Sequence, residues 1–240
     1  MNLAQINIKK ILENIKQKKI FLDTYPEAVH FLLNDYCNAK CIMCGGNYIN
    51  SNKKITFEKF KIMCDNLNLN YIRRIAYAGA GDPLLNSELK LMIEYIYKNF
   101  PHIFTCITTN GIALTSEKFG YLIENKIGFI NVSINAATRK TYKRIMQVDC
   151  FDKVVENMIA LQRYKQKMNS NLPELQMSFV ANRLNIEELP ILLEIAENVN
   201  CQKINIMYCR FYPSAIRNLN LISQENILKD EFSLFYHKDL

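Results

Sequence analysis

The octapeptide CNAKCIMC, residues 37–44, places three cysteines on one short segment. Three thiols cannot all pair with one another, and a structural zinc site usually has four protein ligands. Three thiolates can instead hold three irons of a four-iron cluster and leave the fourth iron open to another molecule. Cys37, Cys41 and Cys44 are therefore the candidate metal ligands.

On both sides of this segment, short apolar runs alternate with amphipathic stretches. Strands are expected near 28–35, 71–79, 103–109, 128–135, 175–181 and 203–209. Helices are expected at 56–67 and 87–99, from Thr115 or Ser116 onward, and at 138–146, 151–168 and 186–198. Each helical stretch is long enough for a right-handed crossover, so the pattern predicts an α/β fold with a helix-covered parallel sheet. Periodicity leaves both an open doubly wound sheet and a partial barrel available.

The distinctive polar motifs fall where the predicted strands end. CNAKCIMC follows the first strand, AGAGDP (78–83) the second and TNG (109–111) the third, while SIN (133–135) closes the fourth. In either sheet architecture, ligands bind at the carboxyl ends of parallel strands. We therefore expect these motifs to meet at one site.

Composition and charge limit the other functions to consider. The 240 residues are 49% hydrophobic, which is enough for a sizeable core in one large domain or two small ones. No apolar run is long enough to span a bilayer, and residues 1–20 lack the features of a secretory signal, so a cytoplasmic protein is expected. The net charge of +7 is spread along the chain, which favours a solvated surface over a dedicated nucleic-acid site.

Residues 1–25 are expected to form a lead-in helix before the main domain. Apolar side chains at Ile8, Ile11, Leu12 and Ile15 recur near helical spacing. The more common role of such a face is packing on the domain, and the alternative is contact with a membrane surface.

The CxxxCxxC spacing resembles the cluster loop of the radical SAM superfamily, and the resemblance extends over roughly 28–209. It implies a partial (βα)6 barrel of parallel strands, with a core domain at 26–210 and a C-terminal extension at 211–240. It also implies a 4Fe–4S cluster that cleaves S-adenosylmethionine (SAM) to a 5′-deoxyadenosyl radical. The chain is then an enzyme, an oxidoreductase or related catalyst, which abstracts a hydrogen atom from a small organic substrate. We expect a sugar-like or other polar metabolite, and a reductant protein such as flavodoxin or ferredoxin as partner.

The resemblance also implies which residues contact SAM. The segment 79–82 matches the GGE-like segment that receives the SAM amine, with alanine and aspartate in place of glycine and glutamate. Ser133 and Asn135 match positions near the carboxylate and ribose. Met146 stands at the commonest arginine position, so Arg144 is the substitute candidate. The full set of expected cofactor contacts is Met43, Gly79, Ala80, Gly81, Asp82, Asn110, Ser133, Asn135, Arg144, Val180 and Met207.

The end of the chain departs from the most similar branch of the superfamily, whose members often carry an added cysteine-rich SPASM or twitch module. After the sixth strand only Cys209 remains, so either the chain is truncated or the enzyme works with one cluster. A second metal centre at Cys201 or Cys209 stays open. In the tail, Arg210 and Arg217 are candidate anion contacts, although a solvated basic tail is the more common case.

Three alternatives remain at this point. A zinc site would add His30 or His102 to the cysteines, although neither histidine has zinc-finger spacing. A peptide-modifying radical SAM maturase would act on a peptide in place of a metabolite. A non-catalytic metal-binding or interaction protein would keep the barrel without the reaction, and the intact cysteine motif counts against it.

Overall fold

The computed structural model describes residues 1–44 and 52–209, together with the backbone of 233–237. Within these residues, strands and helices alternate from the first strand onward, and six strands run parallel in one sheet. The predicted α/β class is therefore confirmed. Arg210, Arg217 and most of the predicted extension at 211–240 lie outside the described residues.

The strands follow one another across the sheet in chain order. They are β1 Ala28–Phe31, β2 Arg74–Tyr77, β3 Phe104–Thr109, β4 Phe129–Ser133, β5 Glu174–Ala181, β6 Lys203–Tyr208 and β7 Ser233–His237. The α-helices are α1 Leu3–Lys16, α2 Phe57–Asn66, α3 Leu89–Asn99, α4 Ser116–Glu124, α5 Arg139–Met146, α6 Phe151–Lys167 and α7 Leu189–Asn198. Short 3-10 turns form η2 Leu69–Tyr71, η3 Pro83–Leu85 and η4 Ile186–Glu188.

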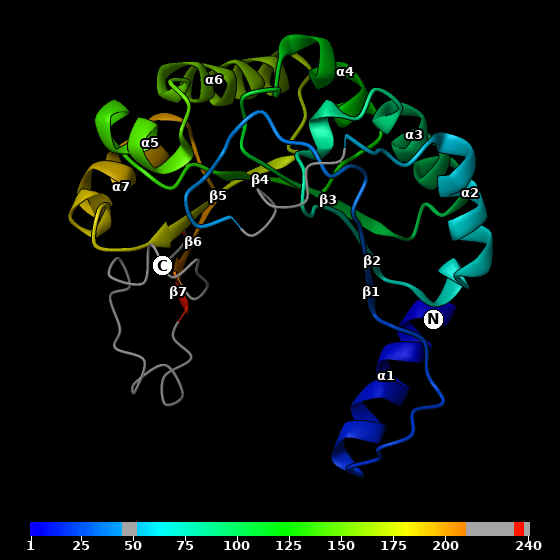
Figure 1. Ribbon diagram of the computed structural model, residues 1–240. Helices are drawn as coiled ribbons and strands as arrows, with labels where there is room; N and C mark the ends of the chain where they lie inside the picture. The colour runs from blue at the N-terminus through cyan, green and yellow to red at the C-terminus, as the bar shows by residue number, and fades with distance from the viewer. Residues whose placement is uncertain (45–51, 210–232, 238–240) are drawn as a thin grey trace.

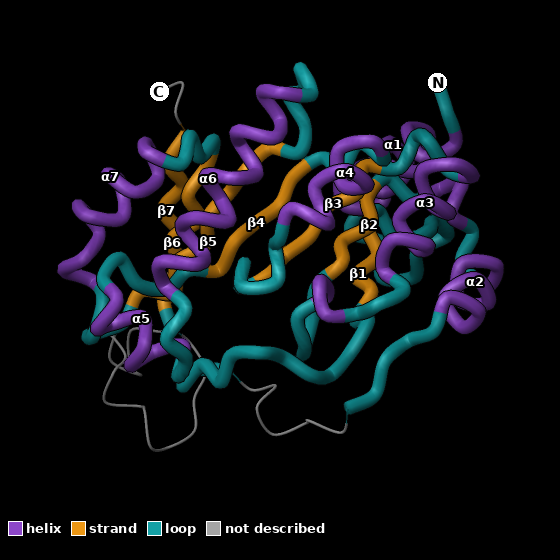
Figure 2. The backbone as a smooth tube through the Cα atoms, turned by 90° about the horizontal axis from the view of Figure 1, so that it is seen from above, coloured by secondary structure: helices purple, strands orange, loops and turns teal. Residues whose placement is uncertain are grey.

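The sheet is curved and open. Helices α2 to α7 lie along its convex side, and α1 stands beyond the β1 edge (Figure 1). At the opposite edge β7 pairs antiparallel with β6, an edge strand that the sequence did not predict. Because β1 and β7 are the two ends of the strand order, the sheet does not close on itself. The expected partial barrel of six parallel strands is confirmed, and Figure 2 shows its strands side by side from above.

Successive side chains along each strand point to opposite faces of the sheet, so the two faces carry different residues. Ile130 and Val132 on β4, and Leu175, Met177 and Phe179 on β5, are fully buried in the core shared with the helices. Burial of each such side chain contributes about 1.5–3 kcal/mol, so this layer supplies much of the stability. The residues between them point to the concave side, where no helix of the described residues lies (Figure 1).

Helix α1 packs through a buried asparagine as well as apolar residues: Ala4 is buried, and Ile8 and Ile11 are half-buried. The Asn7 amide donates to the carbonyls of Tyr25 and Tyr71 at 3.0 and 3.2 Å and accepts from the Tyr25 N–H at 3.0 Å. Leu12 and Ile15, which were predicted to face the domain, are exposed, so that prediction is wrong for them. The turn at η2 presents carbonyls to α1, and a buried amide satisfies them where an aliphatic side chain could not. None of the described helices is long and apolar enough to cross a membrane.

A carboxylate joins the loops that follow β4 and β5. Glu188 accepts hydrogen bonds from the N–H groups of Ala137 and Thr138 at 2.7 and 3.2 Å and from the Thr138 hydroxyl at 2.7 Å. These N–H groups lie at the start of α5, where no carbonyl of the helix itself can accept their hydrogen bonds. Glu188 therefore fixes α5 relative to the β5 loop.

We expect Glu188→Ala to lower the free energy of unfolding by about 2 kcal/mol, because it leaves these donors without their acceptor. Glu187→Ala is the matched control, since Glu187 is the exposed neighbour, and its effect should stay within about 0.5 kcal/mol. Urea denaturation followed by circular dichroism measures both. Equal effects of the two variants would contradict this role.

Candidate functional site

The cysteine loop follows β1 and runs along the carboxyl edge of the sheet. In Figure 1 this blue loop passes in front of the middle strands towards α5. Apart from one bridge between Asn34 and Lys54, residues 32–44 form no strand or helix. The backbone groups of the loop therefore need partners from neighbouring elements, and the loop after β2 and the end of α5 supply them.

The loop after β2 holds the beginning of the cysteine loop. Gly81 N donates to Asn34 O at 3.1 Å, and Asp82 N donates to Tyr36 O at 3.0 Å. The Asn34 amide adds bonds to the carbonyls of Tyr36 and Asp82 at 2.8 and 3.0 Å. A Cβ at Gly81 would lie 2.3 Å from Tyr36 O, so only glycine permits this close approach.

The end of α5 holds the second half of the loop. Lys40 N and Ile42 N donate to the carbonyls of Met146 and Ile145 at 3.0 and 2.9 Å. Helix carbonyls at this position lack partners within the helix, so they are available to the loop. The two bonds flank Cys41, whose sulfur lies 3.4 Å from the Met146 thioether. Cys41 is thus placed by backbone bonds on both sides.

The loop after β3 contacts the first cysteine. The Asn110 amide nitrogen lies 3.2 Å from Cys37 Sγ and 2.7 Å from Asn38 Oδ1. Asn110 is itself held by Asp82, whose carboxylate accepts from Asn110 N at 2.8 Å and from the Thr109 hydroxyl at 2.7 Å. Two loops, after β2 and after β3, and the end of α5 therefore converge on the cysteine loop.

Burial raises the pKa of two of the three thiols of the loop, Cys37 and Cys41. Burial raises the pKa of Cys41 to about 12, and the nearby Cys44 and Cys37 add to the shift. Partial burial also raises the pKa of Cys37, against hydrogen bonds from Ala39 N and Asn110 that lower it. Each of these thiols would lose its proton when a cation binds, because the cation supplies the charge compensation that the site lacks.

The donor set fits an iron–sulfur cluster better than a single ion. In the described part of the chain, no three His, Cys, Asp or Glu side chains converge on one metal ion. A cluster needs no such convergence, because each thiolate binds a different iron. The Tyr142 hydroxyl, buried without a hydrogen-bond partner among the described residues, has a pKa raised by burial and then by Cys150, Cys41 and Cys37. The Tyr142 hydroxyl is therefore a hydrogen-bond donor that is available near these cysteines.

The histidines of the zinc alternative lie elsewhere. His102 precedes β3, at the opposite edge of the sheet, and its ring contacts Leu69 O at 3.3 Å. His30 lies within β1 and is exposed. Cys201 and Cys209 stand before and after β6, at opposite ends of that strand. The structure brings neither histidine into the cysteine loop and does not pair these two late cysteines.

Apart from Arg144, the expected SAM-contacting residues fall into two groups. The first is exposed or half-buried near the carboxyl ends of the strands or in the cysteine loop, and it comprises Met43, Gly79, Ala80, Gly81, Ser133, Val180 and Met207. They can reach a bound molecule, and their contacts stay a prediction.

Asp82, Asn110 and Asn135 form the second group, and their side chains already have protein partners. Asp82 is 3% exposed, and besides Thr109 and Asn110 it accepts from Leu84 N at 3.0 Å. Asn135 accepts from Val180 N at 2.8 Å and lies 3.5 Å from the Met146 sulfur. The structure gives these three side chains a role in holding the loops.

Arg144, the substitute for the arginine position, is exposed on α5, whereas Met146 is buried beneath Cys41. The contact of Arg144 with the SAM carboxylate stays a prediction.

Sequence reasoning did not single out Asn34 and Asn185, two of a series of buried asparagines at the strand ends. Asn34, Asn182 and Asn185 are nearly inaccessible, and the Asn185 amide donates to the carbonyls of Asn135 and Val180 at 2.9 and 3.0 Å. A signal was present, because an asparagine follows within three residues of β1, β3, β4 and β5. We call Asn34, Asp82, Asn110, Asn135, Asn182 and Asn185 the polar belt.

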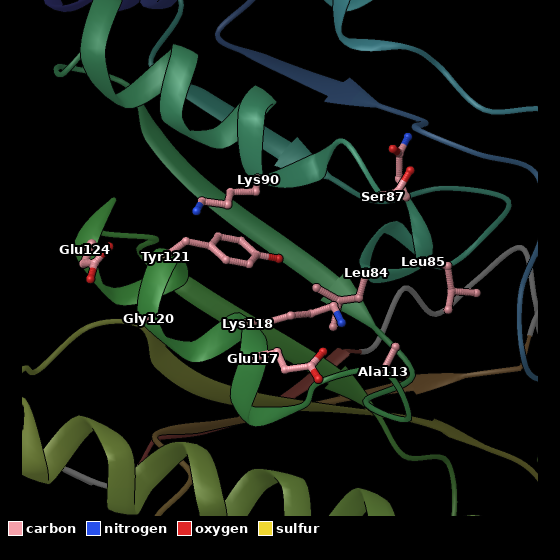
Figure 3. A pocket seen from close by; sticks show the side chains of 11 residues that line it. Leu84, Leu85, Ser87, Lys90, Ala113, Glu117, Lys118, Gly120, Tyr121 and Glu124 are labelled. Carbon is pink, nitrogen blue, oxygen red and sulfur yellow. The ribbon is translucent and has the colours of Figure 1, made fainter.

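A pocket of about 700 Å³ lies between α3 and α4, away from the cysteine loop (Figure 3). Lys90, Tyr121 and Lys118 project into it, together with Glu117 and Glu124. The two lysines are balanced by the two glutamates, and of the described cysteines none lines the pocket. The cysteine loop, and not this pocket, is the candidate site.

Comparisons with known proteins agree with this assignment. A family model described as the Radical SAM superfamily matches residues 32–173, more than half of the chain. A relative named "Probable GTP 3',8-cyclase" from Saccharolobus islandicus is 27% identical over 187 residues, which cover 75% of this chain and 56% of that protein. A protein of the same name from Methanocaldococcus jannaschii is 26% identical and covers 70% of this chain and 54% of that protein. The chain thus spans about half the length of these relatives.

Two solved structures show the same fold. Streptococcus suis SuiB bound to S-adenosylmethionine matches with a TM-score of 0.64 and 14% identity, over 88% of this chain and 46% of that chain. TYW1 with a lysine-pyruvate adduct matches with a TM-score of 0.60 and 16% identity, over 95% of this chain and 80% of that chain. At these identities the likeness concerns the fold alone.

We expect Gly81→Ala to lower both the melting temperature and the iron bound per chain, because the new methyl group would collide with the Tyr36 carbonyl. Gly120→Ala is the matched control: a Cβ there meets nothing closer than 3.7 Å, and alanine favours the helix α4. Thermal melts and iron analysis after anaerobic reconstitution measure both. Normal iron loading in Gly81→Ala would contradict the close contact between the two loops.

Proposed function

The chain belongs to the radical SAM superfamily, and on that premise we propose that Cys37, Cys41 and Cys44 hold a 4Fe–4S cluster used with SAM to remove a hydrogen atom from a small polar substrate. When bound, such a cluster would supply the one-electron reduction that cleaves SAM to methionine and the 5′-deoxyadenosyl group that abstracts hydrogen. The observation that carries the proposal is that the loops after β2 and β3 and the end of α5 all contact the segment that holds the three thiols. The remaining steps concern what the protein's own residues do.

Backbone hydrogen bonds hold both halves of the cysteine loop. Lys40 and Ile42 are bonded to the end of α5, and Gly81 and Asp82 bond the start of the loop. These bonds are backbone to backbone, so they do not depend on the protonation of the thiols. Such positioning reduces the ordering that metal binding would otherwise require.

The open side of the site suits the amine and carboxylate of SAM. Gly79 is exposed and Ala80 half-exposed, so their backbone groups can approach the amine. The Ser133 hydroxyl, 3.0 Å from that of Ser178, stands at the end of β4 where the carboxylate or ribose would lie. In this proposal Asp82 supports the 79–81 segment and does not contact the amine itself.

The concave face beneath the site supports a polar substrate. The register aligns Asn131 with Gln176 and Ser133 with Ser178 across β4 and β5. The Asn131 amide donates to the Ser178 hydroxyl at 3.1 Å, while its oxygen has no hydrogen-bond partner in the described part of the chain. A buried acceptor without a partner is costly, and a substrate hydroxyl or N–H could satisfy it.

The relatives named as GTP cyclases support the same class of substrate, since a nucleotide is a small polar metabolite. Peptides remain the second candidate. SuiB, which shares the fold, has been solved bound to its precursor peptide SuiA. An external one-electron donor of the flavodoxin or ferredoxin class is the expected protein partner.

With dithionite and SAM, the anaerobically reconstituted protein should release 5′-deoxyadenosine and methionine in equal amounts. The variant with all three cysteines 37, 41 and 44 changed to alanine should release neither above background. Cys150→Ser is the matched control, because Cys150 lies outside the loop at the start of α6. If the wild type releases no more 5′-deoxyadenosine than the triple variant, a binding role without catalysis is the better account.

The class of substrate is tested by adding GTP, an amino sugar or a short peptide to the same assay. A polar metabolite should increase 5′-deoxyadenosine release, and Ser178→Ala should reduce the increase. Stimulation by the peptide alone would favour a peptide-modifying enzyme.

A further inference from the structure

The Asn110 side chain is fixed at both ends. Its nitrogen reaches Cys37 Sγ and Asn38 Oδ1, and its oxygen accepts from Ile112 N at 2.9 Å. The residue is 7% exposed, although Cys37 itself is exposed. The amide can therefore not rotate away from the sulfur without the loss of several bonds.

Asp82 determines where Asn110 stands. Its carboxylate takes the Asn110 backbone N–H at 2.8 Å and the Thr109 hydroxyl, which in turn accepts from Gly111 N at 3.1 Å. The carboxylate is buried, and burial raises its pKa while these hydrogen bonds lower it. Asp82 thus ties the loop after β2 to the loop after β3, and it presents Asn110 to the cysteine.

We propose that Asn110, oriented by Asp82, is a positioning residue that raises the reduction potential of the cluster by donating a hydrogen bond to the Cys37 sulfur. This inference rests on the proposed function, because it requires a cluster at the three cysteines. It concerns a different property of the site, namely how readily the site accepts an electron.

The physical reason is the added negative charge of the reduced state. An N–H group directed at a thiolate stabilises that charge, and hydrogen bonds to the sulfurs are among the determinants of cluster potential. Cys37 receives a second N–H from Ala39 at 3.5 Å, whereas the sulfur of Cys41 faces the thioether of Met146.

The test is an anaerobic redox titration of the reconstituted protein without SAM, followed by the EPR signal of the reduced cluster. For Asn110→Ala we expect the ratio of reduced to oxidised cluster at fixed potential to fall about tenfold, as expected for the loss of one charge-assisted hydrogen bond. That change equals a shift of about 59 mV to more negative potential for one electron. Asn110→Asp keeps the shape and the acceptor for Ile112 N but loses the donor, so it should shift in the same direction.

Asn157→Ala is the matched control. Its amide donates to Gly111 O and Ile112 O at 2.9 and 3.3 Å, so it supports the same loop without contacting Cys37. Its potential should equal that of the wild type. An equal shift in Asn157→Ala, or no shift in either Asn110 variant, would overturn the inference.

A measurement on the unmutated sequence covers the case in which the Asn110 variants do not fold. Pulsed EPR of protein labelled with ¹⁵N at asparagine side-chain amides should detect a weakly coupled nitrogen at the reduced cluster, and its absence would contradict the hydrogen bond. Measuring the iron and sulfide content separates failure of the proposed function from failure of this inference. A wild type without a cluster refutes the proposed function, whereas a loaded cluster with an unchanged potential refutes only this inference.

Discussion

The site depends on buried side-chain hydrogen bonds that hold the loops at the carboxyl edge of the sheet. Parallel strands bring several loops to one edge, but the loops have backbone groups that no ladder satisfies. The polar belt supplies partners for these groups: Asn34 joins the β1 and β2 loops, Asp82 joins the β2 and β3 loops, and Asn185 joins the β4 and β5 loops. The cysteine loop is placed by this belt and by the end of α5, so the position of the thiols follows from the bonds beneath them.

Side chains alternate along each strand, so one face of the sheet carries the apolar residues that stabilise the fold and the other carries polar residues available for chemistry. Ile130 and Val132 on β4 face the helices, while Asn131 and Ser133 between them face the concave side. The apolar layer stabilises the curved sheet from one side only. The other face can therefore carry polar groups such as the unpartnered oxygen of Asn131, at a cost to stability that a bound substrate would offset.

Much of this architecture was predictable from sequence, because local patterns carry it. The spacing of Cys37, Cys41 and Cys44 indicated the cluster loop, and alternating apolar and amphipathic segments indicated the six parallel strands and the helices between them. The contacts of the polar belt were not predictable, since partners that lie 28, 48 or 50 residues apart in the sequence leave no local trace of each other. For the same reason the bond between Asp82 and Asn110 and the role of Glu188 were not foreseen. The antiparallel β7 was missed because an edge strand after a long tail breaks the repeating pattern.

The central claim is that three thiols of one loop bind three irons and leave the fourth for SAM. Mössbauer spectroscopy of protein reconstituted with ⁵⁷Fe, recorded with and without SAM, tests it most directly. The account predicts that one iron site of the four changes its isomer shift and quadrupole splitting when SAM is added, while the other three keep theirs. Four equivalent irons that do not respond to SAM would contradict it, as would protein that binds zinc and no sulfide.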